Sequence, residues 1–197
     1  MSAGHKRGRR NVRKPGAVAT SLVAQTNARP ILDATAIRLA TRRMATEIVE
    51  RLGGGEPALG SLALVAIRNG GVALTNRIAD EIEATEGIRP VIGTVDIALY
   101  RDDIGRLADP LVGPSEIPVS LDDKAVVLVD DVLFTGRTVR AAIDAVLDYG
   151  RPRSIRLAVL IDRGHRELPI AADFVGRAIV TDRRDNVVVA DEGVYVR

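Results

Sequence analysis

The sequence predicts an α/β fold with a mostly parallel central sheet flanked by helices. Short continuous apolar runs alternate with longer segments whose apolar residues recur at helical spacing. Continuous apolar runs are typical of parallel strands that are buried on both faces. Because strands and helices alternate along the chain, a layered sheet with crossover helices is expected. The 197 residues, 46% of them hydrophobic, suit one domain with a sizeable core.

The amino-terminal half contains two predicted helices and two predicted strands. The first helix begins after Asp33, a candidate N-cap, and ends at a run of three glycines. An apolar strand follows those glycines, and a second helix, ended by Gly87, leads to a second strand. These four elements are expected at residues 34–52, 62–67, 72–86 and 91–100.

The carboxyl-terminal half begins with a polar segment rich in Gly and Pro, which we expect to be a mobile loop over a functional site. A strand, a helix ended by Gly150 and another strand come next. The loop is expected at residues 101–118, and the other three elements at 124–129, 137–149 and 154–161. The last apolar segments, 174–182, 186–190 and 193–197, are expected to be short β segments that decorate the domain. The sequence contains no internal repeat and no second core.

The formal net charge of +2 averages two unlike parts of the chain. Residues 1–30 hold seven of the 28 basic residues and none of the 26 acidic ones, so the remainder has a charge of −5. We expect a disordered basic tail over residues 1–30 and a single domain over residues 31–197. The alternatives for the tail are an arm that contacts RNA or DNA phosphates and, by composition, an organelle presequence. The mildly acidic body argues against a surface coated with nucleic acid.

Composition excludes several kinds of site. The chain has no cysteine, which excludes disulfides, thiolate chemistry and cysteine zinc sites. His5 and His165 lie too far apart in sequence to indicate a local metal cluster, so any metal is expected to arrive with the substrate. No apolar run reaches the roughly 18 residues of a membrane span, and none follows the basic start as in a signal peptide. We therefore expect a cytoplasmic protein.

The stretch VVLVDDVLFTGRT, residues 126–138, contains the candidate residues for ligand binding and catalysis. Asp130 and Asp131 follow a buried strand, at the sheet edge where ligands collect in open α/β folds. The TGRT turn at 135–138 then opens a helix, and its hydroxyls and unpaired N–H groups suit a phosphate. Gly136 lets the backbone approach that phosphate closely.

Adjacent carboxylates beside a phosphate cradle must face something other than the phosphate. Hydroxyl groups, Mg²⁺ or a developing cation would all fit. A ribose 5-phosphate satisfies the whole arrangement, and the same carboxylates would stabilise a cationic anomeric carbon. The motif therefore favours glycosyl transfer at a phosphorylated ribose.

Other interpretations of the acidic strand lack their partner residues. A Walker B strand needs a G-x-x-x-x-G-K-[ST] loop, and none of Lys6, Lys14 and Lys124 lies in one. A response-regulator pocket lacks its late lysine, and a dinucleotide fold lacks G-x-G-x-x-G after the first strand. The remaining alternative is that the two aspartates only cap a turn.

VVLVDDVLFTGRT resembles the phosphoribosyl-pyrophosphate signature of type I phosphoribosyltransferases. The stretches DIALYRDD, LIDRGHRELP and ILDATAIRLATRRMATEIVER are similar to the PyrR family, pyrimidine operon regulators that also act as uracil phosphoribosyltransferases. The resemblance, over residues 31–177, implies the type I phosphoribosyltransferase fold with a small hood. It also implies Mg²⁺-dependent conversion of uracil and phosphoribosyl pyrophosphate (PRPP) into UMP and pyrophosphate.

The resemblance assigns roles to residues, with Asp130 and Asp131 as the catalytic pair that holds the ribose hydroxyls. The implied PRPP- and UMP-binding residues are Val126, Val127, Leu128, Val129, Asp130, Asp131, Val132, Leu133, Phe134, Thr135, Gly136, Arg137 and Thr138. The implied pyrophosphate loop is Arg68, Asn69 and Gly70, the start of a flexible loop that excludes water is Tyr100 and Arg101, and the base region is Ile161, Asp162 and Arg163.

The resemblance also implies an RNA-contacting face on the first helix and the GHRELPI segment. Its basic residues in this chain are Arg42, Arg43, Arg166 and Arg177. Thr46 replaces a histidine of the family and Ala171 a basic residue, so fewer phosphate contacts are implied. A dimer interface is the alternative role for the arginines of the first helix and of GHRELPI, and His165 is expected at a surface or subunit contact rather than as a base.

The pyrophosphate loop departs from the family as well. Asn69 and Gly70 stand where the family commonly has a second arginine. One cation fewer should weaken pyrophosphate binding, although backbone donors can compensate.

We therefore expect a uracil phosphoribosyltransferase that also regulates pyrimidine (pyr) operon expression by UMP-dependent RNA binding and transcriptional attenuation. The alternatives are an RNA-binding attenuator with vestigial catalysis and a phosphoribosyltransferase for another base, such as a purine. The expected partners are PRPP, uracil or UMP, pyr leader RNA and further copies of the chain in a homo-oligomer, with no membrane. Mg²⁺ is expected to arrive bound to the substrate, with no metal held by the protein alone.

Overall fold

The computed structural model describes residues 28–102 and 113–197. Residues 1–27 of the predicted basic tail and residues 103–112 of the predicted loop lie outside the described residues.

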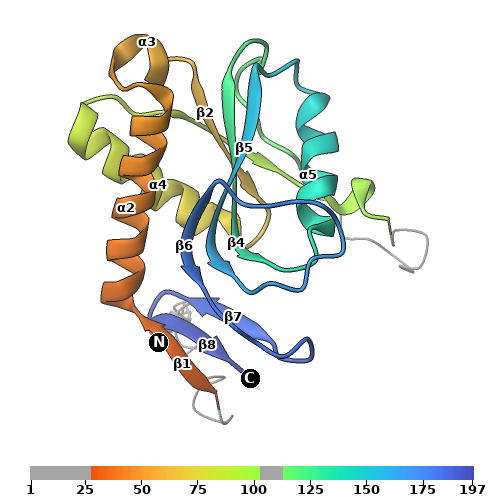
Figure 1. Ribbon diagram of the computed structural model, residues 1–197. Coiled ribbons are helices and arrows are strands. Elements are labelled where there is room, and N and C mark those ends of the chain that lie inside the picture. The colour runs from red at the N-terminus through yellow and green to blue at the C-terminus, as the bar shows by residue number, and fades with distance from the viewer. Residues whose placement is uncertain (1–27, 103–112) are drawn as a thin grey trace, which may run out of the picture.

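A parallel sheet in the order β3-β2-β4-β5-β6 forms the centre of the described domain (Figure 1). Its strands are β2 (Leu62–Ile67), β3 (Val91–Val95), β4 (Ala125–Leu133), β5 (Ser154–Asp162) and β6 (Phe174–Ala178). Every residue of β2 and the first six of β4 are buried, as continuous apolar runs predict.

Helices cover both faces of this sheet (Figure 1). They are α2 (Ala34–Leu52), α4 (Gly71–Glu86) and α5 (Arg137–Leu147), with a short α3 (Gly55–Leu59) that the sequence did not predict. Alternate residues of β2 belong to two separate cores, with Leu62 and Leu64 packed with α2 and α4, and Ala63 and Val65 packed with α5. The sheet is therefore the middle of three layers.

The predicted ends of the first two helices are confirmed. The Asp33 carboxylate accepts a hydrogen bond of 2.7 Å from the backbone N–H of Ala36, so it caps α2. Gly53 and Gly87 adopt the left-handed conformation at the ends of α2 and α4.

A small antiparallel sheet forms the hood (Figure 1). It consists of β1 (Arg29–Asp33), β8 (Gly193–Val196) and β7 (Val187–Ala190), in that order. Arg29 and Pro30 thus belong to a strand, two residues before the predicted start of the domain. β1 leads directly into α2, so the hood is joined to the core at the start of that helix.

Several predicted boundaries are wrong. The expected strand 91–100 ends at Val95, because the Asp96 carboxylate accepts hydrogen bonds from the backbone of Ala98 and Gly113 and turns the chain into the 3₁₀ helix η1 (Ala98–Tyr100). β4 continues past residue 129 to Leu133, because it stays paired with β5.

The last apolar segments also differ from the prediction. β6 does not decorate the domain but pairs in parallel with β5, and Phe174 is fully buried in the core. α5 ends at Leu147, two residues earlier than expected. None of the described helices is long and apolar enough to cross a membrane.

Candidate active site

Asp130 and Asp131 lie in the last part of β4, the middle strand of the sheet. Asp130 is only 7% exposed, and this burial, together with the charge of Asp131, raises the pKa of Asp130 to about 8. Burial also raises the pKa of Asp131. Since the two groups interact, the pair binds a proton near neutral pH unless a ligand supplies donors or positive charge.

The loop between β2 and α4 lies directly against this pair. A Cβ atom at Gly70 would lie 2.4 Å from the Asp131 carboxyl carbon, and one at Gly71 would lie 2.0 Å from the Val129 carbonyl oxygen. The two glycines therefore let the loop approach the acidic strand more closely than any other residue would allow. The peptide bond between Arg68 and Asn69 is cis.

A cleft of about 620 Å³ brings the predicted residues together. It is lined by Arg68, Asn69, Asp96, Ile97, Ala98, Arg101, Gly113, Asp130, Asp131, Val132 and Thr138. These residues come from the carboxyl ends of β2, β3 and β4 and from the first turn of α5. Such a position is the one that open α/β sheets use for ligands.

Arg68 provides a donor suited to an anion in this cleft. One terminal nitrogen donates to the Pro114 carbonyl at 2.6 Å, but the buried Nε has no hydrogen-bond partner within the described part of the chain. A buried unpaired donor is costly, and an anionic ligand would satisfy it.

The TGRT turn has the backbone geometry that the motif predicts. Gly136 adopts a φ of 91°, and α5 begins at Arg137. The Arg137 side chain, however, pairs with Asp102 and, at 2.8 Å, with Glu167. The turn therefore offers backbone N–H groups and hydroxyls to a ligand, while this guanidinium is engaged by carboxylates.

The two residues predicted to begin the flexible loop lie in different surroundings. Arg101 lines the cleft, whereas the hydroxyl of Tyr100 donates to the Asp148 carboxylate just beyond α5. Of the other motif residues, Val126–Val129 and Leu133 are buried in the two cores and anchor the strand that carries the acidic pair.

The residues of the predicted base region, 161–163, contact other parts of the protein. Ile161 is buried in the core. Arg163 is 5% exposed, lies over the Phe134 ring and donates to the carbonyls of Asp182 and Asp185 at 2.7 Å. Asp162 pairs with Arg166 at 2.5 Å.

A second cavity, of about 410 Å³, adjoins the acidic pair under the hood. Asn69 and Asp131 line both this cavity and the cleft. The remaining residues that line the cavity are Gly70, Ala73, Leu74, Arg77, Leu160, Val189, Ala190, Asp191 and Glu192. The hood residues were not predicted from the sequence, because no local pattern shows that they approach α4. Asp96 was not predicted either, although an acid directly after an apolar run is the pattern that revealed Asp130.

The arginines of the predicted RNA face fall into two groups. Arg42 and Arg43 lie on α2 and Arg177 on β6, with Arg43 paired with Glu47 and bonded to the Val175 and Gly176 carbonyls. Arg166 lies elsewhere and donates to the carbonyls of Ile170, Phe134 and Gly164. Arg166 is therefore engaged both within its own segment and by the carbonyl of Phe134.

His165 lies beside this segment and outside the lining of the cleft. Its Nε2 is 2.8 Å from the Thr181 carbonyl oxygen, and its ring packs edge-on against Phe134. Thr46 bonds to its own helix through the Arg42 carbonyl. Within the described residues, no group of three or more His, Asp or Glu side chains could hold a metal.

Comparison with known proteins gives concordant results. Residues 28–197 match the phosphoribosyl transferase domain family. The bifunctional protein PyrR of Geobacter sp. strain M21 is 53% identical over 161 residues, which cover 81% of this chain and 89% of that protein. The bifunctional protein PyrR of Enterococcus faecalis V583 is 46% identical over 162 residues, covering 82% and 89%. The solved hypoxanthine phosphoribosyltransferase of Trypanosoma cruzi shares the fold, with a TM-score of 0.63, 19% identity and coverage of 81% and 85%.

Proposed function

Because the chain belongs to the PyrR proteins of the phosphoribosyl transferase domain family, we propose that it converts uracil and PRPP into UMP and pyrophosphate and regulates pyr operon expression through RNA. The observation that carries the enzymatic part is the pair of buried Asp130 and half-buried Asp131, placed in one cleft with two arginines and with Thr138 of the TGRT turn.

The acidic pair binds the ribose. Its carboxylates accept hydrogen bonds from the 2- and 3-hydroxyls, and these donors replace the proton that the buried pair otherwise holds. As the bond from the anomeric carbon to pyrophosphate breaks, positive charge develops on the ribose. The two ionised carboxylates stabilise that charge, and their low-dielectric surroundings strengthen the effect.

The 5-phosphate binds at the start of α5. Backbone N–H groups of residues 135–138 and the Thr138 hydroxyl are the donors, and the helix dipole favours a negative charge there. Because Arg137 is paired with Asp102 and Glu167, this cradle relies on neutral donors.

The leaving pyrophosphate lies between Arg68 and Arg101. The unpartnered Nε of Arg68 and the backbone of the β2–α4 loop are its donors. Asp96, Asp130 and Asp131 line the cleft without forming a group that could hold a metal alone, so Mg²⁺ would bind together with PRPP, whose phosphate oxygens would supply its further ligands. Bound with PRPP, Mg²⁺ would neutralise charge that develops on pyrophosphate.

Uracil occupies the cavity under the hood in this proposal. The cavity shares Asp131 with the cleft, so a base within it lies next to the anomeric carbon, and Ala73, Leu74 and Leu160 provide apolar walls. The role predicted for residues 161–163 is then indirect, because Arg163 holds the 181–185 turn of the hood in place.

An assay with labelled PRPP, Mg²⁺ and single bases tests the activity. UMP should form with uracil, and no nucleotide should form with hypoxanthine. Product with hypoxanthine alone would overturn the assignment and favour a purine phosphoribosyltransferase.

The regulatory part of the proposal places RNA on the face of α2 and β6. Arg42, Arg43 and Arg177 supply its cations, and a homo-oligomer in the cytoplasm is part of this proposal. A gel shift with pyr leader RNA, with and without UMP, tests it. Binding that is indifferent to UMP at moderate salt would exclude UMP-dependent attenuation.

A further inference from the structure

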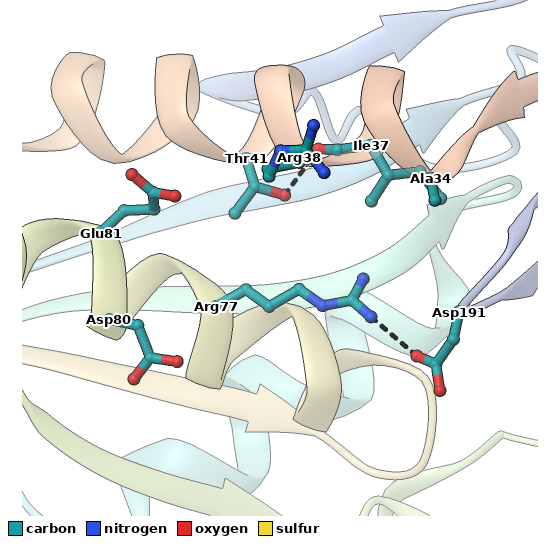
Figure 2. A pocket seen from close by; sticks show the side chains of 8 residues that line it. All are labelled: Ala34, Ile37, Arg38, Thr41, Arg77, Asp80, Glu81 and Asp191. Carbon is teal, nitrogen blue, oxygen red and sulfur yellow. Dashed lines mark hydrogen bonds and ion pairs between the residues drawn. The ribbon is translucent and has the colours of Figure 1, made fainter.

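Arg77 of α4 reaches across to Asp191, at the turn between β7 and β8 of the hood (Figure 2). The Nη2 atom of Arg77 lies 2.7 Å from Oδ1 of Asp191. Both residues line the cavity of about 410 Å³ beside Asp131 and also a separate pocket of about 340 Å³ between α2 and α4. The ion pair is thus part of the wall between the two spaces.

Helical spacing directs Arg77 toward the cavity. Arg77 lies one turn after Ala73 and Leu74 on α4, and all three line the cavity next to Asp131. This face of the helix begins at Gly70 and Gly71, whose backbone touches the acidic strand. The same short stretch of helix therefore contacts both the catalytic pair and the hood.

The other acids near Arg77 have different partners. Asp80 pairs with Arg89 at 2.7 Å, and Glu81 lies 3.9 Å from Arg42. Among the described residues, Asp191 is therefore the carboxylate that Arg77 engages directly.

The turn that Arg77 holds forms the outer wall of the cavity. Ala190, Asp191 and Glu192 line it from the hood, opposite Leu160 of β5. The next residue, Gly193, packs so closely that a Cβ atom would lie 2.6 Å from the Leu32 carbonyl oxygen. β8 is therefore fixed at its start, and the position of the turn relative to α4 depends on the Arg77 contact.

We propose that Arg77 is a positioning residue for the base. It holds the Asp191–Glu192 turn against α4, and this sets the width of the cavity in which the base meets the anomeric carbon. The proposal rests on the proposed function for the identity of the base. The pair is partly exposed, with side chains 38% and 88% accessible, so it contributes little to global stability. Loss of this ion pair should therefore weaken binding of the base more than it lowers the free energy of unfolding.

Replacement of Arg77 by glutamine tests the proposal. We expect Arg77→Gln to raise KM for uracil about threefold to fivefold, the most that an exposed ion pair can contribute, while KM for PRPP and kcat stay nearly unchanged, because the base pocket widens and the PRPP cleft does not. Arg77→Lys should recover part of the loss. Asp191→Asn should resemble Arg77→Gln, and the double variant should be no worse than either, since both remove one contact.

Arg89→Gln is the matched control, because it removes ion pairs with Asp80 and Glu83 of α4, none of which lines the cleft or the cavity beside Asp131. Thermal unfolding of each variant reports folding. Equal rises in KM for uracil and PRPP, or additive effects of Arg77→Gln and Asp191→Asn, would overturn the proposal. Wild-type turnover is measured first with uracil and hypoxanthine. If only hypoxanthine reacts, the proposed function fails, and KM for hypoxanthine in the same variants still decides the role of Arg77.

Discussion

The raised pKa values of Asp130 and Asp131 result from the position of these residues in β4. β4 is the middle strand of the sheet, and its last residues stay paired with β5 after the pairing with β2 ends at Val129. The β2–α4 loop lies against the pair on the other side. Burial disfavours two charges at adjacent positions, and this raises both pKa values. A ligand that donates hydrogen bonds from hydroxyl groups and develops positive charge lowers the free energy of the ionised pair. A ribose that undergoes glycosyl transfer has both properties.

Neutralising one member of the pair should impair turnover. Asp131→Asn keeps the volume of the side chain but removes its charge, so kcat for UMP formation should fall by more than about tenfold while the fold is retained. Steady-state kinetics with circular dichroism checks this, and Asp144→Asn, in an exposed ion pair of α5, is the control. Unchanged turnover would mean that the Asp131 carboxylate is structural.

The raised pKa of Asp130 also predicts how stability depends on pH. The folded protein binds a proton at Asp130 up to a pKa of about 8, whereas an unfolded aspartate releases it near pH 3.9. The folded state thus binds more protons between these values, and the contribution to the free energy of unfolding falls as pH rises from about 4 through about 8.

Urea denaturation at a series of pH values tests this dependence. Asp130→Asn cannot ionise, so its stability relative to the wild type should increase from about pH 5 to about pH 8 and level off above that. Parallel stability profiles for the two proteins would contradict the burial argument.

At the scale of elements, the β2–α4 loop and β4 fit together through a glycine. Gly70 has an ordinary φ of −66°, so alanine is allowed by the backbone, but its Cβ would clash with the Asp131 carboxylate. Gly70→Ala should therefore lower kcat/KM for PRPP at least about tenfold with little loss of stability. Gly87→Ala provides the contrast, because Gly87 has a φ of 70° with open space around it and should cost about 1 kcal/mol of stability without loss of activity. Equal activity of Gly70→Ala and wild type would refute the close fit.

The sequence predicted the elements whose signals are local. The apolar runs of β2 and β4, the Asp33 cap and the glycine ends of α2 and α4 all depend on near neighbours, and the structure confirms them. β6 was misjudged because its place in the sheet depends on pairing with β5, which residues 174–178 do not reveal by themselves.

At the site, too, contacts between residues distant in sequence could not be predicted. The motif 126–138 identified the acidic pair and the cradle, since all their residues are contiguous. Arg137 and Arg166 were assigned to ligands, yet Arg137 pairs with the distant carboxylates Asp102 and Glu167. Arg166 likewise donates to the distant carbonyl of Phe134, besides its local partners. Such partners become visible only once the chain is folded.

At the scale of the whole molecule, the domain has two bodies that meet at the reaction site. The central sheet carries the acidic pair and leads into the TGRT turn, and the hood lies beside this end of the sheet (Figure 1). Hood residues 189–192 line the cavity next to Asp131. Arg163 and Arg77 connect the bodies at two points, one at the 181–185 turn and one at Asp191. The position of the base should therefore depend on how firmly the hood is held.

The basic tail provides a prediction for RNA binding. Residues 2–27 contain six cations and no acid, whereas the rest of the chain is acidic overall. Deleting them should leave UMP formation within about twofold but weaken binding to pyr leader RNA. The plot of log affinity against log salt should become shallower by about 2 or more, because each lost phosphate contact removes about 0.7 to 0.9 from the slope. Filter binding at several salt concentrations measures this, and an unchanged slope would show that the tail does not contact RNA.

The central claim is that the TGRT turn and the acidic pair together hold a ribose 5-phosphate. A crystal structure of the protein with UMP tests it most directly. The 5-phosphate should lie within hydrogen-bond distance of the backbone N–H groups of residues 135–138, with the ribose hydroxyls on Asp130 and Asp131 and the base toward the hood. A UMP molecule bound elsewhere, with the cradle and both carboxylates left without contact to it, would contradict the account.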